Sequence, residues 1–470
     1  MTEQDHPAER ARFIDQGIPD QGLFAGAPHP LSRAAWRVAP QAFPVPPAAA
    51  ALLAELGPAV LALYQAVNHL YLLSRRGAAP EFVARYLDLG KPEAVRRMAA
   101  MGRFKTELPR VLRPDILVGG DSWAITELDS VPGGIGLTAC MATRYAGLGD
   151  PVVGGATGML DHFAAALREA AGTPRPAVAV VIAPEAADYE PEMQWVADRL
   201  RDRGLAVWAV RPESLEFDAG RVLARDDSGR WVPIDLVYRF FELFDLPNIP
   251  RSEQLMAAVR QRWVRITPPY KHQLEEKLVL GLFHSPRLSA WWRQELGAAH
   301  DSLLRRLIPP TWILDPAPVP PAAVIPGLSI AGGPLSSFHE LGAATQKERR
   351  LVLKVSGFSP QAWGARGVFV GHDLPQDEWR RLIEEALDRF AASPYVLQPF
   401  HKSRLFDVQY FDFGRSELCP LRARLRLSPY YFVHGGTAHL GGALATLCPE
   451  DKKLLHGMRE AIMVPVAIGS

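Results

Sequence analysis

RPDILVGGDSWAITELDSVPGGIG, residues 113–136, has the most informative pattern in the sequence. An aliphatic run, a Gly-Gly-Asp turn and a second extended run follow one another, which predicts a β-hairpin. Folding the chain back at the turn places Asp115 opposite Glu127. Because side chains alternate between the two faces of a strand, Arg113 shares a face with Asp115. For the same reason Asp129 shares a face with Glu127.

The acidic residues of this hairpin predict a cation site. Directly opposed strand positions bring Cβ atoms to roughly 4.5–5.5 Å, where like charges destabilise the pair. The three carboxylates of Asp115, Glu127 and Asp129 therefore call for a cation. Hard oxygen ligands with no nearby histidine or cysteine cluster favour Mg²⁺. Taken alone, these residues also fit a solvated hairpin whose acidic side chains point into water.

Composition excludes several classes of function. The 470 residues are enough for two or three domains with substantial cores. A formal net charge of +1 gives no argument for a nucleic-acid or anionic-membrane partner. The three cysteines are too few and too scattered for a disulfide framework and favour a reducing compartment.

No targeting segment is apparent, so we expect a soluble, cytoplasmic protein. The N-terminus, MTEQDHPAERARF, is polar and lacks the apolar centre of a signal peptide. The longest apolar stretch, 48–73, is interrupted by Glu55, Pro58 and Asn68. We interpret it as a buried helix pair rather than a membrane span.

Further along the chain the pattern predicts helical, α/β and mixed regions. Residues 1–47 predict little regular structure, and 48–101 predict a helical layer broken at Pro58. The aliphatic run 177–183, an amphipathic helix and the strand 205–210 predict a βαβ unit on a parallel sheet. Short extended runs in the tail end in a helix near 451–457.

The second informative stretch, 351–371, reads LVLKVSGFSPQAWGARGVFVG. A lysine within a buried strand is costly unless its ammonium reaches an anion, and Lys354 occupies such a position. The loop that follows contains Gly364, Arg366 and Gly367, which suits close approach to phosphate oxygens. A surface hairpin with a solvent-reaching lysine is the alternative. No P-loop occurs, and the glycines of 133–136 are too weak a signal for a dinucleotide site.

Together these pieces resemble the circularly permuted ATP-grasp enzymes of the glutathionylspermidine-synthetase type. The resemblance covers roughly residues 110–460. The metal-ligand hairpin precedes the lysine strand, the reverse of the ordinary ATP-grasp order. One departure is Asp129, which stands where the family has asparagine. The matching residues are Arg113 before the first acid, Asp115 and Glu127 in the hairpin, Lys277 at a helix entry, Lys354 with the Gly364–Gly367 loop, and the hinge strand Tyr395-Val-Leu-Gln398-Pro399-Phe400.

The resemblance implies a mixed α/β ATP-grasp fold in four segments. These are an N-terminal extension with a helical layer (1–110), the metal-binding hairpin and its helix (111–170), a pre-ATP-grasp α/β subdomain (171–265), and the ATP-binding lid with the C-terminal part (266–470).

The resemblance also implies an ATP- and Mg²⁺-dependent ligase that joins a carboxylate to an amine through an acyl phosphate. It assigns catalysis to Arg113 and Arg366. ATP binding falls to Lys277, Lys354, Gly364, Gly367, Gln398, Pro399 and Phe400, and metal binding to Asp115, Glu127 and Asp129. A nucleotide-binding protein without ligase activity and a phosphotransferase are the alternatives.

Other groups in the sequence are less informative. His434, His439, Cys448 and His456 lack metal-ligand spacing, so we do not expect a zinc site there. The arginines at 422, 424 and 426 alternate along one predicted strand and could face one anion, or could form an exposed basic strand. Cys140 fits a buried structural cysteine better than a reactive thiolate.

Overall fold

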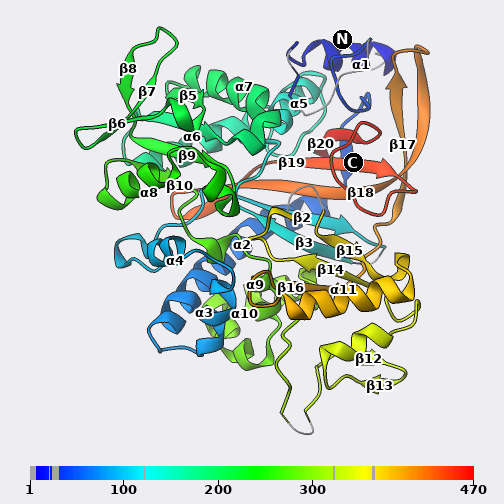
Figure 1. Cartoon of the computed structure of the whole chain (residues 1–470). Coiled ribbons are helices and arrows are strands. Elements are labelled where there is room, and N and C mark those ends of the chain that lie inside the picture. The colour runs from blue at the N-terminus through cyan, green and yellow to red at the C-terminus, as the bar shows by residue number, and fades with distance from the viewer. Residues whose placement is uncertain are drawn as a thin grey trace. The chain divides into compact units, whose positions relative to one another are not determined.

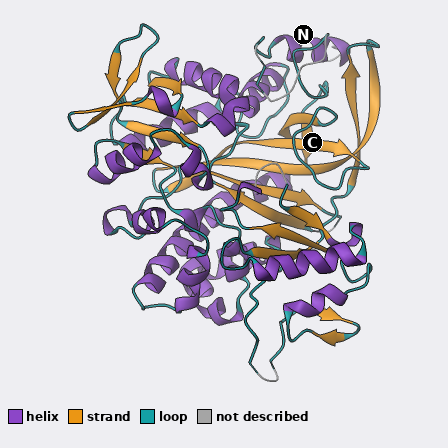
Figure 2. Ribbon diagram, viewed as in Figure 1, coloured by secondary structure: helices purple, strands orange, loops and turns teal. Residues whose placement is uncertain are grey.

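The computed structural model describes residues 7–20, 22–23, 31–120, 122–320, 323–361 and 366–469. Helices and several sheets alternate along the chain, so the architecture is mixed α/β (Figures 1 and 2). The chain divides into two compact units. Unit 1 contains 1–61, 108–269 and 402–470, and unit 2 contains 62–107 and 270–401. The division differs from the four segments expected from the sequence, because 402–470 groups with the hairpin segment.

The main sheet of unit 1 is 7-stranded, in the order β1-β20-β19-β18-β2-β3, with β17 paired to β18. The predicted hairpin forms one side of this sheet as β2 and β3. Strands β18 and β19 are long and antiparallel, and two glycines with positive φ, at 435 and 436, form the turn between them. The bounds are β1 Phe43–Val45, β2 Val111–Val118, β3 Trp123–Asp129, β17 Leu405–Asp412, β18 Glu417–His434, β19 Thr437–Pro449 and β20 Ile462–Ile468.

Two helices of unit 1 position the candidate site. Helix α5 (Ile135–Gly147) follows the hairpin directly, and α6 (Gly158–Ala171) packs on β18 and β19. The approach is close, since a Cβ built on Gly158 would lie 2.8 Å from the carbonyl oxygen of Gly441. Glycine at the start of α6 therefore lets the helix reach the sheet. Unit 1 also contains α1 (Pro7–Gln16) and α8 (Ser252–Gln261).

The predicted βαβ unit is confirmed. Strand β4 (Ala177–Ile182) leads through α7 (Glu190–Arg201) to β5 (Ala206–Val210), and the two strands are parallel. Strands β9 (Leu236–Phe240) and β10 (Arg265–Thr267) complete a parallel sheet in the order β10-β9-β4-β5. A small antiparallel sheet is attached, made of β6 Glu216–Asp218, β7 Arg221–Arg225 and β8 Trp231–Pro233.

The charge buried in β9 has a structural explanation. Arg239 is fully buried, and its guanidinium donates to the carbonyl oxygens of Phe241 and Pro268. Backbone carbonyls therefore satisfy a cation that a buried strand would otherwise not tolerate.

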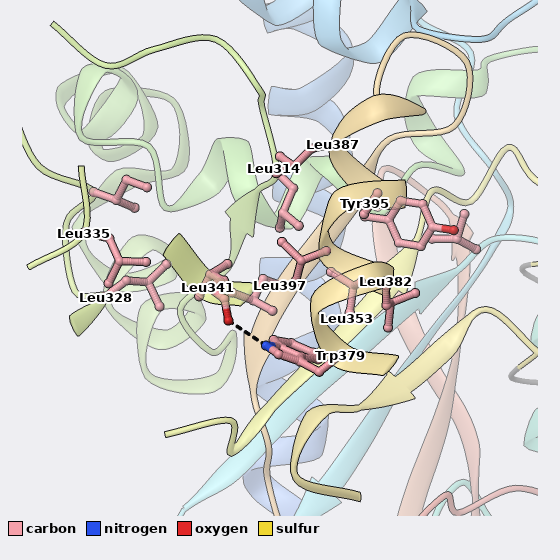
Figure 3. Close-up of a cluster of buried hydrophobic side chains, with 14 residues drawn as sticks. Leu314, Leu328, Leu335, Leu341, Leu353, Trp379, Leu382, Leu387, Tyr395 and Leu397 are labelled. Atoms are coloured by element: carbon pink, nitrogen blue, oxygen red, sulfur yellow. Dashed lines mark hydrogen bonds between the residues drawn. The ribbon is translucent and has the colours of Figure 1, made fainter. Parts of the chain in front are cut away.

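Unit 2 combines helices with a second antiparallel sheet, in the order β11-β16-β14-β15. Leu353 and Leu397 point from this sheet to Trp379 of α11, whose Nε1–H donates to the carbonyl oxygen of Leu341 at 2.7 Å (Figure 3). The bounds are α3 Glu81–Asp88, α4 Glu93–Ala99, α9 Leu278–Phe283, α10 Ser289–Leu307, α11 Gln376–Asp388, β11 Trp312–Ile313, β12 Ser329–Ile330, β13 Gly333–Pro334, β14 Leu351–Val355, β15 Val368–Val370 and β16 Tyr395–Pro399.

The expected helix break at Pro58 is wrong. Helix α2 runs without interruption from Pro47 to Arg75. Proline removes one backbone donor and crowds the preceding turn. The hydroxyl of Tyr431 donates to the carbonyl oxygen of Leu53 at 2.6 Å in that turn, and a Cβ on Gly57 would lie 2.6 Å from the Tyr431 ring. The helix therefore packs closely against Tyr431 of strand β18 just before the proline.

Helix α2 is also the one helix, within the ranges given above, that is long and apolar enough to cross a membrane by length and composition. Its most apolar window is 56% buried, as in the core helices of soluble proteins, which pass the same test.

Three other expectations about secondary structure are wrong. Residues 7–16 form helix α1, although little regular structure was expected before residue 47. The tail forms the continuous 18-residue strand β18 instead of short runs, since pairing with both β19 and β17 stabilises it along its length. The segment 451–457 is not helical.

Candidate functional site

The predicted hairpin register is confirmed. Strands β2 and β3 are antiparallel, with Asp115 opposite Glu127 and Arg113 opposite Asp129. Directly opposed residues of an antiparallel pair share a face, so all four side chains lie on one face of the sheet. A register shift after Asp115 separates this part of the hairpin from the turn.

Asp115 is held by side chains from two strands. It is 3% exposed, and Arg113 Nε donates to its Oδ1 at 3.1 Å. From β18, Arg426 donates to Oδ2 at 3.1 Å and the Ser428 hydroxyl donates to Oδ1 at 2.8 Å. Both carboxylate oxygens therefore have partners, and one of the three alternating arginines does face this site.

Arg113 joins the two acidic strands. Its guanidinium also lies 2.9 Å from Oδ2 of Asp129 and donates to the carbonyl oxygen of Gly133 at 3.1 Å. Burial alone would lower the pKa of Arg113, but Asp115 and Asp129 raise it well above its usual value. Burial raises the pKa of Asp129 despite the opposing effect of Arg113. The guanidinium groups of Arg113 and Arg426 thus balance part of the negative charge for which the sequence predicted a metal ion.

The donor chemistry of the hairpin fits Mg²⁺, since carboxylate oxygens on one face are the ligands that this ion prefers. Asp115, Glu127 and Asp129 do not form a preassembled cluster of closely spaced ligand atoms. Across the described ranges, the one group of histidine, cysteine and carboxylate ligand atoms that all lie within 4.8 Å of one another is formed by three histidines elsewhere. Metal binding by Asp115, Glu127 and Asp129 stays a prediction.

Sequence reasoning missed Glu192. This α7 residue is 1% exposed, and its carboxylate accepts backbone N–H groups of Gly134 at 3.2 Å, Gly136 at 2.7 Å and Leu137 at 3.3 Å. Burial raises the pKa of Glu192 to about 7, although these hydrogen bonds oppose the shift. A side chain of the protein thus caps the glycine-rich start of α5, which is not an open anion site.

In unit 2, Lys354 lies on the central strand β14, opposite Val368 and Val396. Leu353 and Val355, the residues on either side of it in β14, belong to the core packed under α11. Because side chains alternate along a strand, Lys354 points to the other face. The side chain is half-buried. Burial and the Lys354 ammonium lower the pKa of His401, which places the imidazole near this lysine.

Gln398 of the expected adenine hinge shares the Lys354 face of the sheet. It pairs with Val352, two positions from Lys354, and its amide donates to the Thr311 hydroxyl at 2.9 Å. Pro399 ends β16, and the backbone N–H of Phe400 donates to the carbonyl oxygen of Arg350 at 2.8 Å. The predicted strand is therefore present, with the Phe400 N–H already used within the protein, and its role as an adenine hinge stays a prediction.

Lys277 stands at the entry to α9, beside a buried hub that the sequence did not indicate. The neighbouring Glu276 accepts from Lys91, from the Ser356 hydroxyl at 2.6 Å and from the Gly357 N–H at 3.2 Å. Glycine is needed at 357, because a Cβ there would lie 2.2 Å from the carbonyl oxygen of Glu275. The hub fixes the loop after the Lys354 strand against the segment that presents Lys277.

The predicted phosphate loop is described only in part. Gly364 lies outside the described residues. Arg366 is exposed, and Gly367 is buried against Val355, where a Cβ would lie 2.3 Å from Cγ1 of that valine. Glycine at 367 is therefore explained by packing, and the anion-binding role of Arg366 stays a prediction.

Comparison with known proteins supports the fold. No family model matches the chain, and no curated protein matches it. Among solved structures it is similar to a glutathione synthetase-like effector from Globodera pallida in the apo form, with a TM-score of 0.56 and 13% identity over 99% of this chain and 98% of that one. A candidate gamma-glutamylcysteine synthetase from Methylobacillus flagellatus gives a TM-score of 0.40 and 12% identity over 80% and 83%. The first likeness shows a shared fold along nearly the whole chain.

Proposed function

We propose that this chain, which shares the fold of a glutathione synthetase-like protein, is an ATP- and Mg²⁺-dependent carboxylate–amine ligase of the permuted ATP-grasp type. The observation that carries the proposal is the register of β2 and β3, which gathers Arg113, Asp115, Glu127 and Asp129 on one sheet face. Phosphoryl transfer uses carboxylates that hold Mg²⁺ together with a cationic side chain that stabilises the charge of the transferred group.

The acidic residues would hold the metal. Asp115, Glu127 and Asp129 are the proposed Mg²⁺ ligands, and bound Mg²⁺ would offset the charge of the ATP phosphates. Arg113 now bridges Asp115 and Asp129. We propose that its guanidinium turns to the γ-phosphoryl group when the metal replaces it as counter-charge, and that Arg366 assists.

Unit 2 would supply the nucleotide contacts. Lys277 and Lys354 would neutralise the α- and β-phosphates, with Gly364 and Gly367 in the covering loop. Gln398, Pro399 and Phe400 would line the adenine end. The half-buried position of Lys354 on the sheet face opposite α11, shared with Gln398, supports this assignment.

The reaction then runs in two steps. A substrate carboxylate oxygen attacks the γ-phosphorus, a P–O bond forms, and the bond to ADP breaks. An amine nitrogen next attacks the acyl carbon, phosphate leaves, and the nitrogen loses a proton to give an amide. The contribution of the protein is positioning and charge stabilisation, so no covalent protein intermediate is needed.

The test is a product assay with ATP, Mg²⁺ and panels of amino acids, short peptides and polyamines. ADP and phosphate should appear in equal amounts only when an acid and an amine are both present. Glu127→Gln should lower kcat by roughly 100-fold or more, because one electrostatic stabiliser is lost. The matched control is Glu417→Gln, at an exposed position on the same sheet, which should leave kcat unchanged.

Other outcomes would replace the proposal. AMP and pyrophosphate would indicate adenylation, and ADP formed with an acid alone would indicate a phosphotransferase. ATP binding without turnover on any pair would favour a nucleotide-binding protein that lacks ligase activity.

A further inference from the structure

Three histidines that are far apart in the sequence meet at one point of unit 1. His162 comes from α6, and His434 and His439 lie on either side of the β18–β19 turn. Their ligand nitrogens all lie within 4.8 Å of one another, and Nδ1 of His162 is 3.0 Å from Nε2 of His434. All three side chains are half-buried, so the cluster borders solvent.

The three ring centroids form a triangle, while the ring planes are nearly parallel. The ring centroids of His434 and His439 are 4.0 Å apart, those of His162 and His439 are 5.0 Å apart, and those of His162 and His434 are 5.3 Å apart. These three distances describe a compact triangle. Tetrahedral Zn²⁺ with imidazole ligands at about 2.0–2.1 Å requires ligand nitrogens roughly 3.3 Å apart, which is within the range of this cluster.

We propose that His162, His434 and His439 form a binding site for a divalent transition metal, with Zn²⁺ as the ion and a water in the fourth position. Imidazole nitrogen is a preferred donor for zinc, and three protein ligands with one open position is a common zinc arrangement. The site is independent of the proposed ATP chemistry.

An acidic residue of α6 lies against the turn that joins the two strand histidines. Glu169 lies beside the cluster, where it pairs with Arg110 at 2.7 Å and accepts the Gly435 N–H at 2.5 Å. Its carboxylate holds the turn between the two strand histidines in place.

Binding requires a small rearrangement. The ring planes are now within 11° to 24° of one another, and each must turn until it contains the metal. The hydrogen bond between His162 and His434 must also be given up, with its proton moved to another ring nitrogen or released. The ion would then tie α6 to the tip of the longest hairpin of unit 1.

The experiment is a Zn²⁺ titration of the full chain, purified with chelator, by calorimetry in excess Mg²⁺. One Zn²⁺ per chain is expected, with a matching rise in Tm and, with Co²⁺ in its place, visible d–d absorption. His439→Asn and His162→Asn should each weaken Zn²⁺ binding by at least about 100-fold, since a direct ligand is lost. His456→Ala, an exposed histidine outside the cluster, is the matched control and should bind as the wild type does.

Two results would overturn the proposal: no stoichiometric Zn²⁺ binding by the wild type, or equal affinity in a histidine variant whose circular dichroism shows it folded. Because the two variants change residues on different elements, a folding defect in one leaves the other as a test. Excess Mg²⁺ keeps the hairpin carboxylates from contributing.

Discussion

At the scale of single residues, the ion pair with Arg113 gives Asp129 a structural role. The sequence left open whether Asp129, which stands where the family that the sequence resembles has asparagine, serves the metal. In the structure Asp129 is an ion-pair partner of Arg113 at 2.9 Å, and its Oδ1 accepts the Val131 N–H at 2.8 Å. A neutral amide would make a weaker contact with the guanidinium. The extra charge therefore has a structural role as the ion-pair partner of Arg113.

Glu192 gives a prediction about pH at the same scale. The carboxyl has a folded pKa of about 7 against an ordinary value of 4.5, so the folded state holds the proton more tightly. Its contribution to stability is then present below about pH 4.5 and is lost as pH rises towards 7, by on the order of 3 kcal/mol. Urea unfolding from pH 5 to 8 should show Glu192→Gln losing less stability with pH than the wild type.

The substitution Glu192→Gln also removes one hydrogen bond from a backbone N–H. This lowers stability equally at every pH and leaves the slope of stability against pH unchanged. Glu185, an exposed residue shortly before α7, supplies the control. Glu185→Gln should keep the wild-type slope of stability against pH. Parallel curves for Glu192→Gln and the wild type would show that Glu192 stays ionised across this range.

At the scale of elements, the Glu276 hub joins pieces of unit 2 that are distant in the sequence. Lys91 follows α3, Glu276 precedes α9, and Ser356 follows β14. The side chains of Lys91 and Glu276 are 0% and 1% exposed. A buried carboxylate is tolerated only with such partners, so the hub fixes the loop that follows the Lys354 strand.

Removing one partner of this pair should destabilise the protein strongly. Lys91→Met leaves the Glu276 carboxylate buried without its cation, and we expect a loss of about 3–5 kcal/mol in urea unfolding. Arg97→Met is the matched control, because Arg97 and Glu93 pair with side chains 68% and 66% exposed, and it should cost under about 1 kcal/mol. Adding Glu276→Met to Lys91→Met should recover part of the loss. Similar costs for Lys91→Met and Arg97→Met would contradict the hub.

At the scale of the whole molecule, the fold is shared with a glutathione synthetase-like protein along nearly the full chain, while the sequence is only 13% identical. Such a likeness fixes the architecture and leaves chemistry to particular residues. The proposed chemistry therefore depends on the particular residues named above and not on the shared fold.

Nucleotide binding should stabilise the folded protein. Mg²⁺ and ATP at 100 times Kd add about 2.7 kcal/mol to the folded state by mass action, so Tm should rise with ATP concentration. Lys354→Ala should abolish the rise, and Lys347→Ala, at an exposed position of the same unit, should retain it. An undiminished shift in Lys354→Ala would remove Lys354 from the nucleotide site.

The features that depend on neighbouring residues could be predicted from the sequence. The register of Asp115 with Glu127 follows from the two-residue period of strands and a short turn, and it is confirmed. The βαβ unit after residue 176 follows from an aliphatic run, a helix and a second run. Both are local patterns, set by backbone geometry and by which side chains avoid water.

The distant groups that complete these patterns are brought together by packing in three dimensions. Arg426 reaches Asp115 across 311 residues, the Tyr431 hydroxyl donates to Leu53 of α2, and His162 meets two histidines of the tail. No spacing in the sequence predicts these contacts, because each depends on how the long strand β18 packs against its neighbours. The register of the hairpin is thus fixed by neighbouring residues, whereas Arg426, which joins Arg113 in balancing the charge of Asp115, comes from strand β18.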